Sequence, residues 1–410
     1  MKMNEQQFAL IKEQLRKLTS QECFYKHKLE GINVDDIKSQ EDFEKLPFTW
    51  KGDLRDAYPL GLQAVPDEEI VRIHSSSGTT GTPVIIPYTK KDVEDWAIMF
   101  ERCYRMAGIT NLDRIQITTG YGLWTAGIGF QLGCERLGAM AIPMGPGNTD
   151  KQLKMMEDMQ STVLCATSSY ALLLAEEIAK RGISDKIKLK KGIIGSERWG
   201  EKMRDRISKE LGIELYDIYG LTEVYGPGIG VSCGEHNGIH VWDDYLYFEI
   251  VDPVTGENLP DGEVGELVIT TLKKQGAPLI RFRTHDLTRI IPGKCSCGCE
   301  RPRIDTIFGR TDDMVKVKGV NIFPSQIEEF LKNVDGASSE YQFVIDHLEG
   351  KDICTLYVEA EEGVNKYELE HRIVEGFKGK IGITVNAKPV AIGDLPRSEK
   401  KSTRVYDNRY

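Results

Sequence analysis

A loop at residues 74–83 concentrates hydroxyl groups and glycines directly after the apolar-leaning run 69–73. Glycines let a backbone approach a ligand closely, and successive N–H groups with nearby hydroxyls can surround an anion. The loop lacks the Gly-Lys-Ser/Thr of a Walker P-loop. We expect it to hold a nucleotide polyphosphate, with a flexible Ser/Gly linker as the alternative. The candidate phosphate-binding residues are Ser75, Ser76, Ser77, Gly78, Thr79, Thr80 and Gly81.

Three cysteines and one histidine form a second candidate site. They are Cys233, His240, Cys295 and Cys297. Three sulfurs and one imidazole suit tetrahedral Zn²⁺, although Cys-x-Cys is tighter than the usual spacing of zinc ligands. Cys299 and His236 are rival ligands, and reduced residues without metal are the alternative. A closed shell of four ligands leaves no position for a substrate, so the predicted zinc site is structural.

Size and composition limit the classes of protein that fit. The chain has 410 residues, a formal net charge of -10 and 40% hydrophobic residues, which favours two or more domains with sizeable cores. The acidic balance argues against non-specific nucleic-acid binding. We find no apolar segment of a signal peptide at the N-terminus and no run long enough to span a membrane. The cysteines number nine, which is odd, and four of them stand singly before residue 200. This pattern suggests reduced thiols, so we expect a cytoplasmic protein.

The elements that must position these residues alternate between helices and short apolar strands. Such alternation predicts an α/β fold, with a parallel sheet flanked by helices. Ligands bind such sheets at the carboxyl ends of the strands, which places residues 120–127, 168–170, 196–198 and 220–223 at the expected site. Helices are expected over 4–18, 92–106, 150–160, 170–181 and 200–211, and strands over 114–118, 139–144, 163–166, 191–195 and 214–219.

The second half of the chain has a different pattern of predicted strands and helices. Residues 228–307 contain strands at 241–251 and 265–271 with short turns, which predicts a β-rich subdomain. A small α+β domain follows, with a capping box at 325–328 opening a helix, strands at 343–345 and 353–358, and a helix over 367–377. We therefore predict a large N-terminal domain over 1–311 and a small C-terminal domain over 312–410.

Five motifs occur in one order along the chain. They are the loop 74–83, Tyr-Gly-Leu-Thr-Glu at 219–223, Arg-Phe-Arg-Thr-His-Asp-Leu at 281–287, Gly-Arg-Thr-Asp-Asp at the start of 309–319, and Leu-Pro-Arg-Ser-Glu-Lys-Lys at 395–401. Together they resemble the adenylate-forming superfamily of acyl-CoA synthetases, peptide-synthetase adenylation domains and luciferases. Residues 47–55, residues 319–328 and the Cys/His pattern resemble the phenylacetate–CoA ligase family within it. The resemblance covers essentially the whole chain.

The resemblance implies an ATP-dependent ligase of two half-reactions. A carboxylate attacks the α-phosphorus of ATP to give an acyl-adenylate and pyrophosphate, and the thiol of coenzyme A then displaces AMP. The aromatic residues of the expected acyl pocket suit an aryl or arylacetic acid. The alternatives are an adenylating enzyme that passes its acyl group to a carrier protein or an amine, and a nucleotide-binding protein without turnover. The family is often dimeric, which leaves a homodimer open.

The resemblance also implies residue roles. Glu223, beside Thr222, would bind Mg²⁺, which takes oxygen ligands; Asp286 would bind the ribose hydroxyls. Lys401 would stabilise the charge that develops in adenylation, although Lys400 stands where the family usually has glycine. The residues expected around the nucleotide are Ser196, Glu197, Tyr219, Gly220 and Arg310; around coenzyme A, Lys316 and Lys318; in the acyl pocket, Tyr121, Trp124, Gly127 and Tyr170; and at the hinge, Asp312.

Some of these assignments have simpler alternatives. Trp124 is also readily explained as a core residue, because aromatic side chains dominate protein cores. Arg310 and Asp312 could belong to a polar linker, and Lys316 and Lys318 could be ordinary solvated lysines. The chain also departs from the superfamily after the loop, where Val84 follows Pro83 at a place that often carries lysine. The family rotates its C-terminal domain between the two half-reactions, so we expect a mobile one here.

Overall fold

The computed structural model describes residues 2–76, 82–197, 199–348, 351–398 and 402–409. The chain divides into two compact units, and each is built from separate stretches of sequence. Unit 1 comprises Met1–Gly145 and Tyr216–Ile307, and unit 2 comprises Pro146–Leu215 and Phe308–Tyr410. In the part of the chain that the structure describes, no helix is both long and apolar enough to cross a bilayer.

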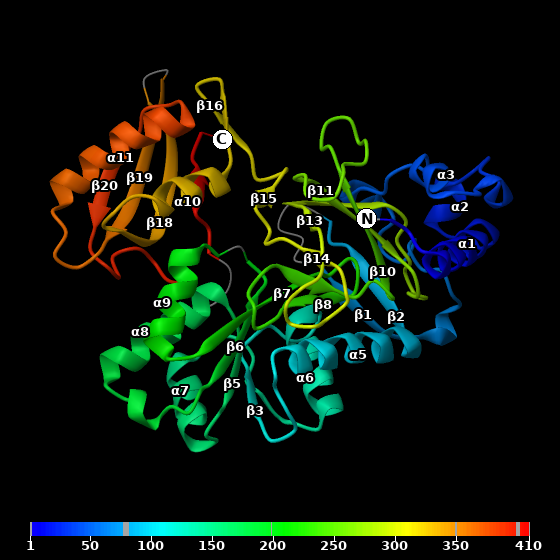
Figure 1. The fold of residues 1–410 in the computed structure, drawn as a ribbon, viewed down its shortest axis with the longest axis horizontal. Helices are drawn as coiled ribbons and strands as arrows, with labels where there is room; N and C mark the ends of the chain where they lie inside the picture. The colour runs from blue at the N-terminus through cyan, green and yellow to red at the C-terminus, as the bar shows by residue number, and fades with distance from the viewer. Residues whose placement is uncertain (1, 77–81, 198, 349–350, 399–401, 410) are drawn as a thin grey trace. The chain divides into compact units, whose positions relative to one another are not determined.

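Unit 1 begins with helices and continues into strands flanked by two long helices (Figure 1). Helix α1 starts with a reciprocal capping box between Asn4 and Gln7 and buries Ile11, Leu15 and Leu18 on one face. Helix α5 starts in the same way, with Thr89 and Asp92 capping each other, and it packs against α6 and β8. The helices are α1 (Glu5–Ser20), α2 (Phe24–Lys28), α3 (Gln40–Glu44), α4 (Lys51–Asp56), α5 (Lys90–Met106) and α6 (Thr125–Leu137).

The strands of unit 1 form four groups. β1 (Ile70–Ser75) and β2 (Ile85–Thr89) make an antiparallel hairpin, and β3 (Arg114–Ile117) pairs in parallel with β4 (Met140–Pro143). An antiparallel sheet contains β10 (Leu246–Val251), β11 (Gly265–Thr271) and β12 (Phe282–Thr288). Another antiparallel run contains β13 (Ile290–Ile291), β14 (Arg303–Ile304), β9 (Ile239–Val241), β8 (Gly226–Ser232) and β7 (Glu214–Leu221).

Unit 2 combines a parallel strand pair with the C-terminal part of the chain. β5 (Val163–Thr167) pairs in parallel with β6 (Lys191–Gly195). A mixed sheet in the order β20–β19–β18–β21 contains β18 (Ala337–Leu348), β19 (Lys351–Ala360), β20 (Asn386–Val390) and β21 (Val405–Asp407). The remaining elements are α7 (Thr149–Asp158), α8 (Ser168–Arg181), α9 (Glu201–Leu211), β15 (Gly309–Arg310), β16 (Val315–Val317), β17 (Val320–Ile322), α10 (Pro324–Lys332) and α11 (Lys366–Ile381).

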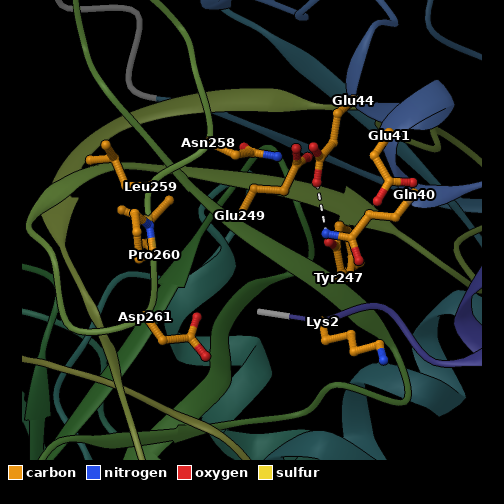
Figure 2. A pocket seen from close by; sticks show the side chains of 11 residues that line it. Lys2, Gln40, Glu41, Glu44, Tyr247, Glu249, Asn258, Leu259, Pro260 and Asp261 are labelled. Atoms are coloured by element: carbon orange, nitrogen blue, oxygen red, sulfur yellow. Dashed lines mark hydrogen bonds between the residues drawn. The ribbon is translucent and has the colours of Figure 1, made fainter.

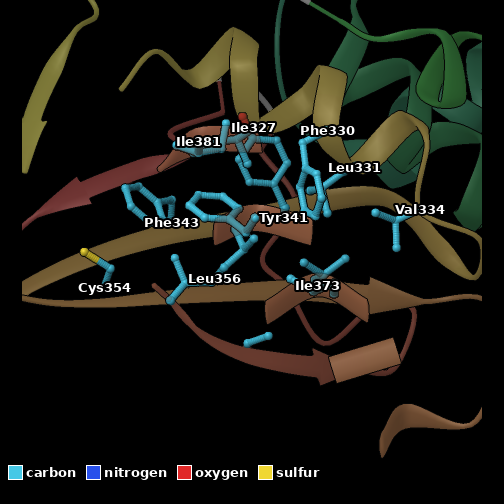
Figure 3. Packing of buried hydrophobic residues seen from close by; sticks show 14 of the residues in the cluster. Ile327, Phe330, Leu331, Val334, Tyr341, Phe343, Cys354, Leu356, Ile373 and Ile381 are labelled. Carbon is cyan, nitrogen blue, oxygen red and sulfur yellow. The ribbon is translucent and has the colours of Figure 1, made fainter. Parts of the chain in front are cut away.

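A continuous apolar cluster joins α10 and α11 to the mixed sheet (Figure 3). Phe330 of α10 and Phe343 of β18 both meet the ring of Phe377 of α11, at centroid distances of 5.6 and 6.0 Å. Gly376 allows this approach, because a Cβ there would lie 2.7 Å from the Phe330 ring. The C-terminal segment therefore has a core of its own within unit 2.

The predicted α/β class with a C-terminal α+β part is confirmed. Two local predictions are wrong. The strand expected over 241–251 is two strands, β9 and β10, separated by a turn in which Tyr245 N donates to Trp242 O. Helix α10 starts at Pro324, whose fixed φ suits the first helical turn, and Phe323 rather than Ser325 is the capping residue. The predicted boundary at 311/312 stays a prediction.

Candidate active site

The base of the hydroxyl-rich loop is a closed β-hairpin. Ser76 N donates to Val84 O at 3.0 Å, and Val84 N donates to Ser76 Oγ at 3.0 Å. Val84 is 0% exposed, so this position places its side chain in the core, where a lysine ammonium would be desolvated. The predicted residues Ser77, Gly78, Thr79, Thr80 and Gly81 lie outside the described residues.

Glu223 lies just beyond the carboxyl end of β7 and is 5% exposed. Its Oε1 is 3.1 Å from Lys51 Nζ, which gives the buried carboxylate a cationic partner. The neighbouring Thr222 Oγ1 lies 3.3 Å from Thr125 Oγ1 at the start of α6. Residues 220–223 therefore gather polar groups where the sheet model predicts a ligand site.

Residues 123–125 connect the loop to the Glu223 turn. Leu123 O accepts a hydrogen bond from Ser75 N at 2.9 Å, while Thr125 contacts Thr222. The predicted phosphate-binding and magnesium-binding segments, which are more than a hundred positions apart in the sequence, are thus joined through one short stretch of unit 1.

Lys51 received no role from the sequence. The segment before it adds to β12 through a bridge between Thr49 and Phe282. Thr49 N donates to Arg281 O at 2.9 Å, and Arg283 N donates to Thr49 O at 2.9 Å. This bridge brings Lys51, the first residue of α4, to Glu223. The signal was present, because residues 47–55 were one of the features that resemble the phenylacetate–CoA ligase family.

Two predicted nucleotide-binding residues meet directly. Tyr219 OH donates to Asp286 Oδ2 at 2.6 Å, and both residues are buried. The bond holds the Asp286 carboxylate in one orientation while leaving it further acceptor capacity. Gly220 follows Tyr219, and a Cβ there would lie 2.1 Å from Gly226 O, so only glycine fits. The structure therefore brings Tyr219, Gly220 and Asp286 together in unit 1.

The predicted acyl-pocket residues of unit 1 fall into a packed pair and an exposed residue. A Cβ at Gly127 would lie 2.5 Å from Tyr121 Cδ2, so the absence of a side chain at Gly127 makes room for the Tyr121 ring. Trp124 precedes α6 and is 45% exposed. Its interpretation as a core residue is therefore wrong.

Tyr170 belongs to unit 2 and is 1% exposed. It packs in an apolar cluster with Leu153 and Met156 of α7, and its hydroxyl lies 3.4 Å from Gly147 O. These contacts account for its burial by packing within unit 2. Its assignment to the acyl pocket stays a prediction.

In unit 2, Glu197 joins two segments of backbone. Its Oε1 accepts a hydrogen bond from Ser169 N at 2.7 Å, and its Oε2 accepts one from Ser402 N at 3.0 Å. Ser169 Oγ and Ser402 Oγ lie 2.5 Å apart. We call Glu197, Ser169 and Ser402 the Glu197 bridge. Lys401, immediately before Ser402, lies outside the described residues, and the exposed Ser196 adopts a positive φ of 71°.

The remaining predicted residues of unit 2 lie on or beside its short strands β15, β16 and β17. Arg310 donates to both carboxylate oxygens of Asp312, at 2.8 and 2.9 Å, so the predicted nucleotide and hinge residues form a bidentate pair. Lys316 lies on β16, and Lys318 lies in the turn between β16 and β17 with a φ of 51°. Both lysines are exposed. Their binding of coenzyme A stays a prediction.

The four predicted zinc ligands converge in unit 1. Their ligand atoms all lie within 4.8 Å of one another, and neither Cys299 nor His236 belongs to this group. Cys233 Sγ is 3.7 Å from Cys295 Sγ, and Cys297 Sγ is 3.4 Å from His240 Nε2. Tetrahedral zinc with normal bond lengths requires about 3.8 Å between two sulfurs and about 3.6 Å between sulfur and nitrogen. The observed separations therefore fit the ion.

The surroundings of this cluster also suit a metal. His240 Nδ1 lies 3.1 Å from Arg301 O, and donation to this carbonyl leaves Nε2 as the ligand atom. Cys299 N donates to Cys297 Sγ at 3.4 Å, which stabilises a thiolate. Cys299 therefore lies close to the cluster as a hydrogen-bond donor through its backbone.

A pocket of about 330 Å³ lies elsewhere in unit 1 (Figure 2). It is lined by Glu41, Glu44, Glu249 and Asp261 among other residues, and none of the predicted site residues that the structure describes belongs to its lining. Glu249 is already paired with Arg281, at 3.0 Å between its Oε1 and Arg281 Nη2. The pocket is acidic, so it would repel ATP and carboxylate substrates.

Comparison with known proteins identifies the family. The model described as "AMP-binding enzyme" matches residues 9–272, and "AMP-binding enzyme C-terminal domain" matches residues 319–409. Phenylacetate-coenzyme A ligase of Pseudomonas putida is 44% identical over 389 residues, covering 92% of this chain and 88% of that protein. The chain belongs to the phenylacetate–CoA ligase family. The same-named enzyme of Escherichia coli K12 is 42% identical, with coverage of 92% and 88%.

Solved structures of an acid–CoA ligase share the fold of this chain. A 2-hydroxyisobutyryl-CoA ligase in the postadenylation state matches with a TM-score of 0.87 and 28% identity, covering 98% of this chain and 89% of that chain. The same ligase in the thioesterification state matches with a TM-score of 0.72 and 29% identity, with the same coverage. The predicted enzyme class is confirmed.

Proposed function

We propose that this enzyme activates phenylacetate or a closely related aryl acid with ATP and transfers the acyl group to coenzyme A. The products are the acyl-CoA, AMP and pyrophosphate. Two relatives that cover most of the chain carry the name phenylacetate-coenzyme A ligase. The partly exposed Trp124 and the Tyr121–Gly127 contact provide aromatic surface that suits an aromatic acid.

The connection between the loop and Glu223 carries this proposal. Ser75 and Thr222 are linked through residues 123–125, so a polyphosphate at the loop would lie near the buried Glu223. Glu223 would hold Mg²⁺, which would neutralise the phosphate charge. Lys51, 3.1 Å from Glu223, would supply the positive charge for the phosphates that a lysine at position 84 supplies in many superfamily members. Asp286, oriented by Tyr219, would accept the ribose hydroxyls.

The second domain would act through Lys401. We propose that its ammonium stabilises the charge shared by the attacking carboxylate and the α-phosphate. The Glu197 bridge holds the backbone of Ser402, the next residue, and so would position Lys401 for adenylation. Rotation of residues 312–410 about Asp312 would break this bridge and bring Lys316 and Lys318 to coenzyme A.

Pyrophosphate release with a panel of acids tests the proposal. We expect ATP-dependent release with phenylacetate, stronger than with short aliphatic acids, and acyl-CoA formation only when coenzyme A is present. Acyl transfer to a carrier protein or an amine without coenzyme A would instead support a stand-alone adenylating enzyme. No pyrophosphate release with any acid would reject the catalytic function.

We also propose that Cys233, His240, Cys295 and Cys297 bind a structural Zn²⁺. The support is the fit of the Cys233–Cys295 and Cys297–His240 separations to tetrahedral zinc. A closed ligand set would tie the loop that follows β8 to the loop between β13 and β14. Metal analysis of the purified protein should find about one zinc per chain; a protein purified under reducing conditions without zinc would contradict the site.

A further inference from the structure

Lys274, in the segment after β11, is a fully buried lysine. Its hydrogen-bond acceptor belongs to Val224, the residue after the proposed magnesium ligand Glu223. Lys274 is 0% exposed, and its Nζ donates to Val224 O. The ammonium lies 3.9 Å from the centre of the Tyr88 ring and 4.4 Å from that of Tyr225. Burial lowers the pKa of Lys274 to about 7, and Asp92 opposes this shift. Burying an ammonium costs free energy, so the burial of Lys274 between two aromatic rings requires an explanation.

The acceptor belongs to the backbone that immediately follows Glu223. Val224 O binds Lys274, Tyr225 O accepts from Tyr88 OH at 2.8 Å, and Pro227 O accepts from Trp96 Nε1 at 2.8 Å. Side chains from β2, from α5 and from the segment after β11 therefore hold this stretch of backbone.

These side-chain bonds matter because residues 222–225 form the turn between β7 and β8. The pairing of the two strands ends at Leu221 and Gly226, so the sheet ladder does not hold the four residues of the turn. Lys274 is the amine donor of the set, and its hydrogen bond to Val224 O is fully buried. Removing a donor from a buried carbonyl leaves that group without a partner that water could replace, which is costly.

The backbone that carries Lys274 is itself anchored. Asp92 accepts hydrogen bonds from Gln275 N at 2.7 Å and from Gly276 N at 2.8 Å. Gln14 Nε2 donates to Lys274 O at 2.8 Å. Since Asp92 lies in the first turn of α5 and Gln14 lies on α1, Lys274 reaches Val224 from a segment that is hydrogen-bonded to two helices of unit 1.

We propose that Lys274 is a positioning residue that fixes the backbone of Glu223 and thereby orients its carboxylate for Mg²⁺. The inference rests on the proposed magnesium role of Glu223. It assigns Lys274 a mechanical role and not an electrostatic one, and the two roles have opposite consequences. Loss of a nearby positive charge would favour Mg²⁺ binding, whereas loss of the anchor would weaken it.

The test compares Lys274→Met with Lys273→Met. Methionine can fill the space between the two tyrosine rings without donating a hydrogen bond. Lys273 is a matched control, because its partly exposed ammonium lies 4.3 Å from the Tyr245 ring and, among the described residues, donates to no carbonyl that follows Glu223. Tyr88→Phe is a second variant, which removes the donor to Tyr225 O and keeps the ring.

Two measurements separate this inference from the proposed function. Hydrogen exchange needs no activity, and Lys274→Met should accelerate amide exchange in residues 221–228 by about tenfold or more while Lys273→Met leaves it unchanged. In phenylacetate-dependent pyrophosphate release, Lys274→Met should raise the MgCl₂ concentration for half-maximal rate by about tenfold, with the KM for phenylacetate within about twofold. Tyr88→Phe should shift both readouts in the same direction.

Unchanged exchange in Lys274→Met would overturn the anchoring role, whether or not the enzyme uses phenylacetate. Faster exchange with an unchanged or lowered magnesium requirement would overturn the link to Glu223. If Lys274→Met fails to fold, Tyr88→Phe decides by the same two readouts. A wild-type enzyme without pyrophosphate release would reject the proposed function, while the exchange measurement would still decide the anchoring role.

Discussion

Replacing Glu197 with glutamine tests how the catalytic segment is held in unit 2. Glutamate accepts two backbone hydrogen bonds in the Glu197 bridge, from Ser169 N at 2.7 Å and Ser402 N at 3.0 Å. Glutamine has one carbonyl oxygen, so Glu197→Gln keeps a neutral bond to one N–H and turns an NH₂ group toward the other.

The expected loss follows from these two bonds. A charged hydrogen bond contributes about 1.5–3 kcal/mol and a neutral one about 1 kcal/mol. Losing one and weakening the other should destabilise the bridged arrangement by about 2 kcal/mol, which corresponds to about a thirtyfold change in the equilibrium. Adenylation needs this arrangement to place Lys401, so its rate should fall by up to about thirtyfold.

The half-reactions are measured separately. Single-turnover pyrophosphate release at saturating ATP reports adenylation, and acyl-CoA formation from synthetic acyl-adenylate reports thioester formation. Glu201→Gln is the matched control, because Glu201 also joins residues 146–215 to residues 308–410 through Lys332 at 2.8 Å. That pair is exposed at 39% and 67%, and exposed ion pairs contribute less than about 1 kcal/mol.

The reasoning fails if Glu197→Gln slows both half-reactions equally or slows neither. A loss confined to the KM for ATP would instead support direct contact between Glu197 and the adenine. If the adenylation rate falls as much in Glu201→Gln as in Glu197→Gln, the effect comes from removing a negative charge and not from the Glu197 bridge.

Three further predictions concern unit 1. Lys51→Met should raise the KM for ATP by about tenfold in pyrophosphate release, because the site loses a cation; an unchanged value would contradict its role. Cys295→Ser should lower both the zinc content and the melting temperature, whereas Cys354→Ser, at a buried position in unit 2, should leave zinc content unchanged. Burial lowers the pKa of His74 to about 4 from 6.5, so the unfolded state binds more protons between these values. The free energy of unfolding should therefore decrease by up to about 3 kcal/mol as pH falls from 6.5 to 4, and urea denaturation of His74→Phe should show a smaller decrease.

Much of the architecture could be predicted because its signals are local. Apolar strands alternating with amphipathic helices predicted the α/β class, and most predicted elements correspond to observed ones within a few residues. The errors have local causes as well. The 241–251 segment is rich in aromatic and aliphatic residues, which favoured one continuous strand, although Asp243 and Asp244 lie in the turn before β10. At α10, the rigid backbone of Pro324 outweighed the capping tendency of Ser325.

Residue types and motif order determined the family and the candidate chemistry. Cysteine, histidine and carboxylate side chains have restricted uses, so Cys233, His240, Glu223 and Asp286 could be selected without coordinates. Tertiary structure alone decided which residues meet. The approach of Lys51 to Glu223 depends on a bridge between Thr49 and Phe282, and Lys274 reaches Val224 from 50 positions away. Such contacts depend on packing and hydrogen-bond geometry between distant segments, which sequence periodicity does not encode.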